Sequence, residues 1–345
     1  MKKLKKIASI VMLAAAVVFT AGCTKPDEPN NGGNDNNGGG GETPEVPTIP
    51  TGAVDGKFSI NENGGKVYFS QGNLQYQAST QTWRFGNPWD FVGGTCGITG
   101  YNPDGEPWPG TIAESNNCHA SATYTGWVDL FSWGTSGWAG GVMACQPYSI
   151  VGNPYPHTYA WEHYIVGDNS NNGLVGQYAN ADWGVYNAIS NGGNQAGLWR
   201  TLTSDEWEYV INGREGSRFC KATLNGVKGL ILIPDGWDNV SFALNRINST
   251  GAAFDANTIS QSTWENTCAP AGLVFLPQTG KRVCNGMGDH YVVSLDLSEG
   301  YGLYWSSTAK TETSAYQYNF HSGNVNLDGG LRYQGLAVRL VQDVR

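Results

Sequence analysis

Residues 199–213 read WRTLTSDEWEYVING, and the start of a helix can be identified within them. Thr203 is followed three residues later by Glu206, which is the spacing of a capping box at a helix N-terminus. Asp205, Glu206 and Glu208 also lie where the helix dipole favours negative charge. These acidic residues therefore have a structural explanation, and we do not predict a catalytic role for them.

The same stretch carries an apolar face and a stop signal. Trp207, Val210 and Ile211 fall on one side of a helix. Gly213 is a plausible C-terminal stop, because glycine accepts the backbone conformation that ends helices. We therefore predict a helix over residues 201–213 with one side buried in a core.

Outward from this helix the chain favours short antiparallel strands, because apolar and polar residues alternate between turn signals. Strands are predicted at 57–60, 66–70, 73–77, 82–85, 222–224, 227–234, 272–276, 302–308, 315–320 and 335–341. Asn225-Gly226 between apolar runs predicts a tight hairpin, and the run at 230–233 predicts a central strand buried on both faces. Residues 86–198 have little periodicity and are predicted to be loops with short elements packed through aromatic side chains.

Composition agrees with a β-rich extracellular protein. The 345 residues include 48 glycines and 13 tryptophans, and only 14% are charged. The net charge of −9 argues against a nucleic-acid partner, because such a partner selects a basic surface.

The N-terminus has the pattern of an export signal. Four lysines lie within the first six residues, and an apolar stretch follows at 7–19, which is short for a membrane span. Small residues then precede Cys23 in a pattern that resembles the bacterial lipobox, although Thr20 stands where leucine is usual. We predict a lipoprotein signal peptide at 1–22, lipidation of Cys23 and attachment to a membrane through that lipid.

Residues 23–51 are rich in Asn, Gly, Pro and acidic residues, a composition typical of a flexible tether. The sequence TKPDE at 24–28 resembles the signal that sends lipoproteins to the cell surface in Bacteroidetes. Its acidic residues have an alternative reading as solvated linker charges. We expect an outer-membrane, lipid-anchored protein exposed at the cell surface.

Six further cysteines leave two alternatives open. Up to three disulfides would form in an oxidising compartment, or several cysteines are buried free thiols. The residues concerned are Cys96, Cys118, Cys145, Cys220, Cys268 and Cys284.

Three motifs carry a family resemblance. The sequence at 199–209 resembles the RLPT-x-x-EWEYA segment of formylglycine-generating-enzyme-like domains, a branch of the C-type lectin fold. YWSST at 304–308 and AVRLV at 337–341 resemble the closing segment of the Fibrobacter succinogenes major paralogous domain, which belongs to the same fold group.

The resemblance covers residues 195–341 best, and 55–198 look like Bacteroidales surface lipoproteins of the same kind. It implies an α+β, C-type lectin-like fold of mostly short antiparallel strands, with one or two helices and long loops. The implied domain spans 52–345, with a β-rich part at 52–198 and a family-like core at 199–341.

The chemistry of the family is not matched by the residues present. Cys268 and Cys284 do not form the closely spaced pair of the oxidase branch, and His157 and His163 have the wrong spacing for the iron-binding branch. The sequence WDN at 237–239 has the wrong order for a calcium-binding lectin. We therefore predict no catalytic residue, no metal and no cofactor.

In this fold group the C-terminal strands and loops commonly form a ligand surface, which implies a non-catalytic binding module for a glycan or a protein. Polar and aromatic residues between Ser307 and Val338, with Trp305 just before them, are typical of adaptable binding surfaces. The predicted ligand-binding residues are Trp305, Tyr316, Tyr318, Asn319, His321, Asn324, Asn326, Asp328, Arg332 and Tyr333. Diversification of this segment by a retroelement is an alternative, but Lys310, Glu312 and Gln317 fit its codon set badly.

Two other function classes stay open. A carbohydrate-active enzyme would use carboxylates beside tryptophans, of which Asp129 and Asp182 are the candidates. The alternative is that both are turn residues whose neighbours pack in the core. A structural surface or adhesin-type component would need neither a soluble ligand nor a catalytic pair.

Overall fold

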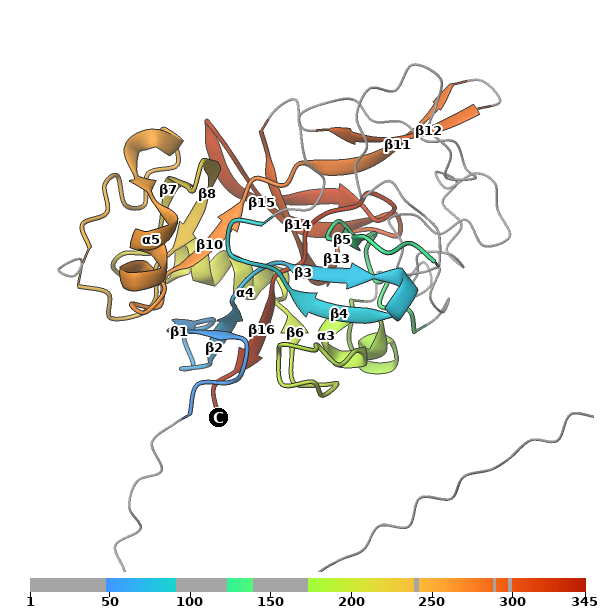
Figure 1. Ribbon diagram of the computed structural model, residues 1–345, viewed down its shortest axis with the longest axis horizontal. Helices are drawn as coiled ribbons and strands as arrows, with labels where there is room; N and C mark the ends of the chain where they lie inside the picture. Colours follow the sequence, from blue (N-terminus) through green and yellow to red (C-terminus); the bar gives the residue numbers. More distant parts are fainter. Residues whose placement is uncertain (1–47, 91–122, 139–172, 239–241, 288–289, 297–299) are drawn as a thin grey trace, which may run out of the picture. The chain divides into compact units, whose positions relative to one another are not determined.

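The computed structural model describes residues 48–90, 123–138, 173–238, 242–287, 290–296 and 300–345 (Figure 1). The described residues all belong to one compact unit, Thr48–Arg345. The predicted signal peptide, Cys23 and nearly all of the predicted tether therefore lie outside the described residues.

The beginning and the end of the described chain meet in one antiparallel sheet (Figure 1). Its strands, in the order in which they pair, are β1 (Ala53–Ser59), β2 (Lys66–Ser70), β16 (Leu340–Asp343) and β6 (Arg200–Thr201). The predicted hairpin of the first two strands is confirmed. Because the last strand lies between β2 and β6, this sheet forms only when distant parts of the chain have come together.

A second sheet confirms the predicted central strand. Its order is β10 (Val274–Pro277), β8 (Val227–Leu232), β7 (Phe219–Leu224) and β9 (Thr258–Ile259), with β9 parallel to β7. Asn225 and Gly226 join β7 to β8 with φ angles of 49° and 81°, so both turn residues adopt the left-handed conformation of a type I′ hairpin.

The other described strands form three smaller sheets. They are β4-β3-β5 (Thr82–Phe85, Leu74–Gln77, Trp127–Val128), β13-β14-β15 (Gly302–Ala309, Ser314–His321, Asn324–Leu331) and β11-β12 (Lys281–Met287, His290–Asp296). The polar strand β15 and the hairpin β11-β12 were not predicted. These segments form strands because they pair with neighbouring strands, and their own apolar pattern does not indicate it.

The predicted helix is confirmed in its capping and in its end at Gly213, and it is corrected at its start. It begins at Ser204 as α4 (Ser204–Glu208) and continues as a π-helical segment, η4 (Tyr209–Gly213). The side chain of Thr203 accepts a hydrogen bond from the backbone of Glu206, and Glu206 caps Thr203 in return. The predicted start at residue 201 was wrong, because Arg200 and Thr201 pair with β16.

The other helical segments are short. They are η1 (Ala78–Thr80), η3 (Gly176–Ala181), α3 (Trp183–Tyr186), η5 (Phe254–Ala256), α5 (Gln261–Thr263) and η6 (Trp264–Cys268). None of them supplies more than a few core side chains, so the described part of the domain is held together mainly by its sheets.

The predicted strand at 335–341 is mostly wrong. Only its last two residues belong to β16, whereas Gly335, Leu336 and Ala337 form single bridges to Arg282, Phe131 and Tyr304. Consecutive residues thus bond to three different segments, and the chain crosses between sheets at this point. The apolar pattern of residues 335–341 predicts that they are buried, but it does not show whether they pair with one strand or with several segments.

The core consists of three apolar clusters rich in aromatic residues. Fully buried tryptophans dominate it, namely Trp133, Trp183, Trp199, Trp207, Trp264 and Trp305. The described part is therefore an α+β structure of mostly short antiparallel strands and loops with few helices. Within it, no helix is both long and apolar enough to cross a membrane.

Two of the six cysteines can be assigned. Cys220 and Cys268 are buried free thiols in the same apolar cluster, and burial raises the pKa of Cys220 to about 12 and that of Cys268 to about 11. The free-thiol alternative therefore holds for both. Cys96, Cys118 and Cys145 lie outside the described residues, and the Cys284 side chain is not described.

Candidate functional site

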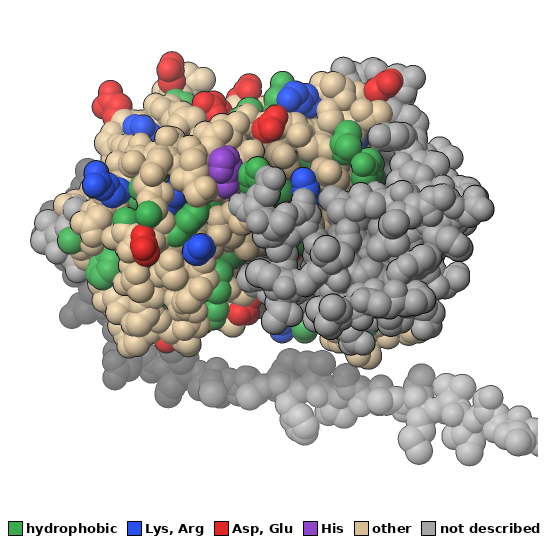
Figure 2. Space-filling model, turned by 90° about the horizontal axis from the view of Figure 1, so that it is seen from above, with side chains coloured by type: hydrophobic (Ala, Val, Ile, Leu, Met, Phe, Trp, Pro, Cys, Tyr) green, Lys and Arg blue, Asp and Glu red, His purple; other side chains and the backbone are tan. Residues whose placement is uncertain are grey.

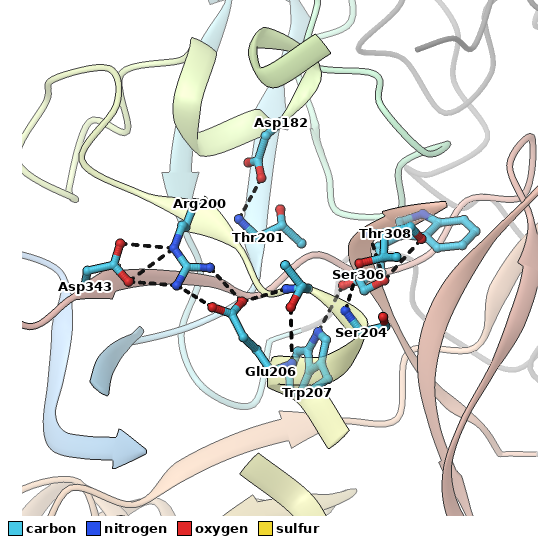
Figure 3. Close-up of polar contacts among 11 residues, drawn as sticks. Asp182, Arg200, Thr201, Ser204, Glu206, Trp207, Ser306, Thr308 and Asp343 are labelled. Atoms are coloured by element: carbon cyan, nitrogen blue, oxygen red, sulfur yellow. Dashed lines mark hydrogen bonds and ion pairs between the residues drawn. The ribbon is translucent and has the colours of Figure 1, made fainter. Parts of the chain in front are cut away.

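The two motifs that carried the family resemblance lie directly against each other (Figure 3). The backbone N–H of Ser204 donates to Thr308 Oγ1 at 3.0 Å, and Trp207 Nε1 donates to the carbonyl of Trp305 at 3.3 Å. The N–H of Ser307 donates to the carbonyl of Leu202 at 2.8 Å. The third motif joins them, because Trp305 donates its N–H to the carbonyl of Ala337.

A polar cluster beside these motifs is the first candidate for a site. Arg200 forms two 2.8 Å bonds to the carboxylate of Glu206 and also pairs with Asp343 at 2.7 Å (Figure 3). It thereby ties β6 to the capped end of α4 and to the last strand. All three side chains satisfy one another, so this cluster is a structural junction between sequence-distant elements.

The carboxylates proposed for the enzyme alternative are buried. Asp182 is 2% exposed, and its oxygens accept hydrogen bonds from the N–H groups of Gly184 and Thr201 at 3.0 and 2.8 Å. Asp129 is fully buried. Neither carboxylate reaches the surface where a sugar would bind, and Asp182 has a complete role as the cap of α3.

Eight of the ten predicted ligand-binding residues lie on the sheet β13-β14-β15, and Arg332 and Tyr333 follow β15, but three of the ten belong to the core. Trp305 is fully buried and donates Nε1 to the carbonyl of Phe131 at 2.7 Å. Tyr318 is 1% exposed and stacks on Trp207. Arg332 is 3% exposed, lies over the ring of Trp133 and donates to backbone carbonyls. These three side chains are buried in the core of the described structure, whereas the prediction placed them on a ligand surface.

Three further predicted residues, Asn324, Asn326 and Asp328, cap the outer edge of β15. Asn324 Oδ1 accepts from the N–H of residue 325 at 2.9 Å, and Asp328 Oδ1 accepts from the N–H of residue 329 at 2.7 Å. Asn326 Nδ2 donates to the carbonyl of residue 327 at 3.4 Å. These side chains occupy backbone groups that an edge strand would otherwise offer to another chain.

Tyr316, His321 and Tyr333 are partly exposed. The ring of Tyr316 lies 5.5 Å from Lys310 Nζ, and His321 packs edge-on against Tyr301 with ring centroids 5.0 Å apart. His321 is paired across the hairpin with Asn324. These contacts place aromatic and polar side chains together on the hairpin without forming a catalytic arrangement.

Two amide oxygens that have no hydrogen-bond partner among the described residues lie on one face of β14. Gln317 stands between Trp305 and Asp328 across the sheet, and Asn319 stands between Leu303 and Asn326. Gln317 is 8% exposed, and both Gln317 Oε1 and Asn319 Oδ1 are buried without a hydrogen-bond partner in the part of the chain that the structure describes. A buried polar atom left unpaired costs about 1–3 kcal/mol, so each of these two acceptors can still gain a hydrogen bond.

The sequence indicated Asn319 but not the special position of Gln317. The alternation of β14 placed both residues on one face, yet their burial depends on Trp305 and on the packing beneath the sheet. No pattern in the chain shows that a polar side chain will lack a partner after folding.

Two observations concern charge and metal ligands in the described part of the protein. Figure 2 shows charged side chains of both signs scattered among uncharged surface on the face seen from above. The described residues contain no group of three His, Cys, Asp or Glu side chains placed to hold a metal ion. His119, His157 and His163 lie outside the described residues.

No family model matches this chain, and comparison with curated proteins and with solved structures finds no significant match.

Proposed function

We propose that this protein is a cell-surface lipoprotein whose folded body is a non-catalytic binding module for a glycan or a protein. The observation that carries the binding role is the pair of buried acceptors, Gln317 Oε1 and Asn319 Oδ1, on the exposed hairpin β14-β15. A ligand hydroxyl or N–H that reaches this face would supply the missing donor.

The proposed body is C-type lectin-like. Its support is the contact among the three resembling motifs, which pack together although more than a hundred residues separate the first from the last. The polar hairpin lies next to the last of these motifs, which agrees with a ligand surface on a rigid scaffold.

The binding role is tested with the mature chain carrying Cys23→Ser, so that it stays in solution, on an array of glycans and host proteins. For any ligand found, Asn319→Ala is expected to weaken binding about tenfold, because a typical hydrogen bond contributes about 0.5–1.5 kcal/mol. Asn266→Ala, which changes an exposed asparagine on η6, is the matched control and leaves binding unchanged. Equal affinity of Asn319→Ala and the unchanged chain would contradict the site.

Anchoring is tested separately by growing the source organism with labelled palmitate. The unchanged chain is expected to incorporate the label and to fractionate with the outer membrane, because an acylated cysteine partitions into lipid. Cys23→Ala is expected to lose both properties. An unchanged chain that takes up no label and remains in the soluble fraction rules out the lipid anchor.

A further inference from the structure

The outer face of the sheet β4-β3-β5 is built differently from its core face. Leu74, Tyr76, Trp83, Phe85 and Val128 point into the apolar core. Because side chains alternate along each strand, the opposite face carries Gln75, Gln77, Thr82, Arg84 and Trp127. This face therefore combines one cation, one indole and three uncharged polar groups, and it has no aliphatic side chain.

Arg84 is held in a fixed position on this face. Its guanidinium carbon lies 3.7 Å from the centroid of the Trp127 ring, and its Nε donates to Gln75 Oε1 at 2.9 Å. Gln75 is itself 1% exposed, so the group that orients the guanidinium is nearly immobile. Stacking and one hydrogen bond together restrict the side chain before any ligand arrives.

The two terminal nitrogens of Arg84 are unused. Neither Nη1 nor Nη2 has a hydrogen-bond partner among the described residues, and neither belongs to the buried atoms of that part of the chain. Arg84 is partly exposed. The terminal nitrogens of a guanidinium form a planar fork that matches the two oxygens of a carboxylate.

The nearby Asp90 opposes anion binding by its charge, but it does not bond to the terminal nitrogens of Arg84. Asp90 Oδ2 accepts hydrogen bonds from the backbone N–H and side-chain amide of Asn87 at 3.1 and 2.9 Å. Arg84 and Asp90 form no ion pair in the described structure. Burial lowers the pKa of Arg84, and the negative charge of Asp90 only partly counters this. The cation is thus partly desolvated without a bound counterion.

The lack of aliphatic side chains beside the terminal nitrogens of Arg84 favours a sugar carboxylate over a peptide carboxylate. Peptide partners are usually anchored by apolar side chains in pockets, and the outer face has no aliphatic group to form one. The amides and the hydroxyl of this face are already bonded within the chain. Gln75 Oε1 accepts from Arg84, Gln77 donates to the carbonyl of Thr125 and accepts from Thr80, and Thr82 donates to the carbonyl of Thr80. The guanidinium is therefore the group of this face that remains for a ligand.

We propose that Arg84 and Trp127 form a binding site for the carboxylate of an acidic sugar of the uronic-acid class. The two Nη groups donate to the two carboxylate oxygens, and Gln75 and Trp127 hold the guanidinium in place. The site lies on a different sheet from the amide pair of β14 and does not depend on the function proposed for that pair.

The experiment measures binding of trigalacturonate to the mature chain with Cys23→Ser by calorimetry, with its methyl ester and an acetylated triglutamate peptide as separate arms. We expect the trisaccharide to bind at least tenfold more tightly than either of them. Hydrogen bonds to a charged group contribute about 1.5–3 kcal/mol, so Arg84→Gln is expected to weaken binding about 10–100-fold. Arg246→Gln changes an exposed arginine elsewhere and is expected to leave affinity unchanged.

Trp127→Phe keeps the cation and weakens the stacking surface, so we expect a severalfold loss of affinity. Spectra of the unchanged chain labelled with ¹⁵N-arginine give a readout that needs no variant, since binding is expected to shift mainly one Nε–H signal. Absence of binding, equal binding of the methyl ester, or full affinity in Arg84→Gln would overturn the site. Equally tight binding of the peptide would overturn its assignment to a sugar.

Discussion

Replacing Trp207 with alanine is expected to lower the free energy of unfolding by about 3–5 kcal/mol. The side chain is fully buried and contacts Phe69 and Tyr318, each with ring centroids 5.8 Å away. It also joins α4 to the sheet β13-β14-β15, because its Nε1 donates to the carbonyl of Trp305. Alanine would leave a large cavity at the point where the two motif segments meet.

Urea unfolding followed by far-ultraviolet circular dichroism measures this loss. Trp138→Ala is the matched control, because Trp138 is 37% exposed, and its substitution is expected to cost less than about 1 kcal/mol. A loss below 1 kcal/mol for Trp207→Ala would show that the contact between α4 and the sheet is not central to stability.

Asp182 is expected to make the protein more stable as the pH falls from about 6 to about 4. Burial raises the pKa of Asp182 to about 6, and the hydrogen bonds from Thr201 and Gly184 only partly offset this effect. The folded state therefore holds the proton more tightly than the unfolded state, whose aspartate pKa is about 3.9. Stability from this group is fully present below the unfolded pKa and is lost as the pH rises through 6. Two pKa units correspond to about 3 kcal/mol.

Comparison of the unchanged chain with Asp182→Asn isolates this effect from other titrating groups. The difference between their free energies of unfolding is expected to change by about 2 kcal/mol between pH 4 and pH 7, with the unchanged chain gaining at low pH. A pH-independent difference would contradict the buried titration.

Asp235→Asn supplies a contrast of opposite sign. Burial of Asp235 acts to raise its pKa, but hydrogen bonds from Ser59, Lys66 and Arg214 outweigh burial and lower it. Stability from Asp235 is therefore present above the unfolded pKa and is lost as the pH falls. The two variants should shift the pH profile in opposite directions.

Local signals in the chain determined several elements correctly. The capping pair Thr203 and Glu206 starts the helix, and Asn225-Gly226 forms the hairpin turn. These features were predictable because each depends on residues within a few positions of one another. The alternative prediction for Asp182, a turn residue whose neighbours pack in the core, also agrees with the structure, because Asp182 caps α3 beside the buried Trp183.

Tertiary structure decided which polar and aromatic residues lie at the surface and which lie in the core. Trp305, Tyr318 and Arg332 were predicted to contact a ligand, but they face the core because Trp207, Phe131 and Trp133 pack against them or accept their hydrogen bonds. Tryptophan, tyrosine and arginine occur both in ligand-binding surfaces and in cores, so the residue types alone do not distinguish the two.

The sequence by itself thus determined the helix start, the tight hairpins and the strand-rich character of the chain, because short-range hydrogen bonding and alternation fix these features. Only the folded arrangement brought Arg84 over Trp127 and placed β16 between β2 and β6, and it left the side-chain oxygens of Gln317 and Asn319 without partners among the described residues. Those outcomes depend on contacts between residues far apart in the chain, and burial there results from the combined packing of several elements.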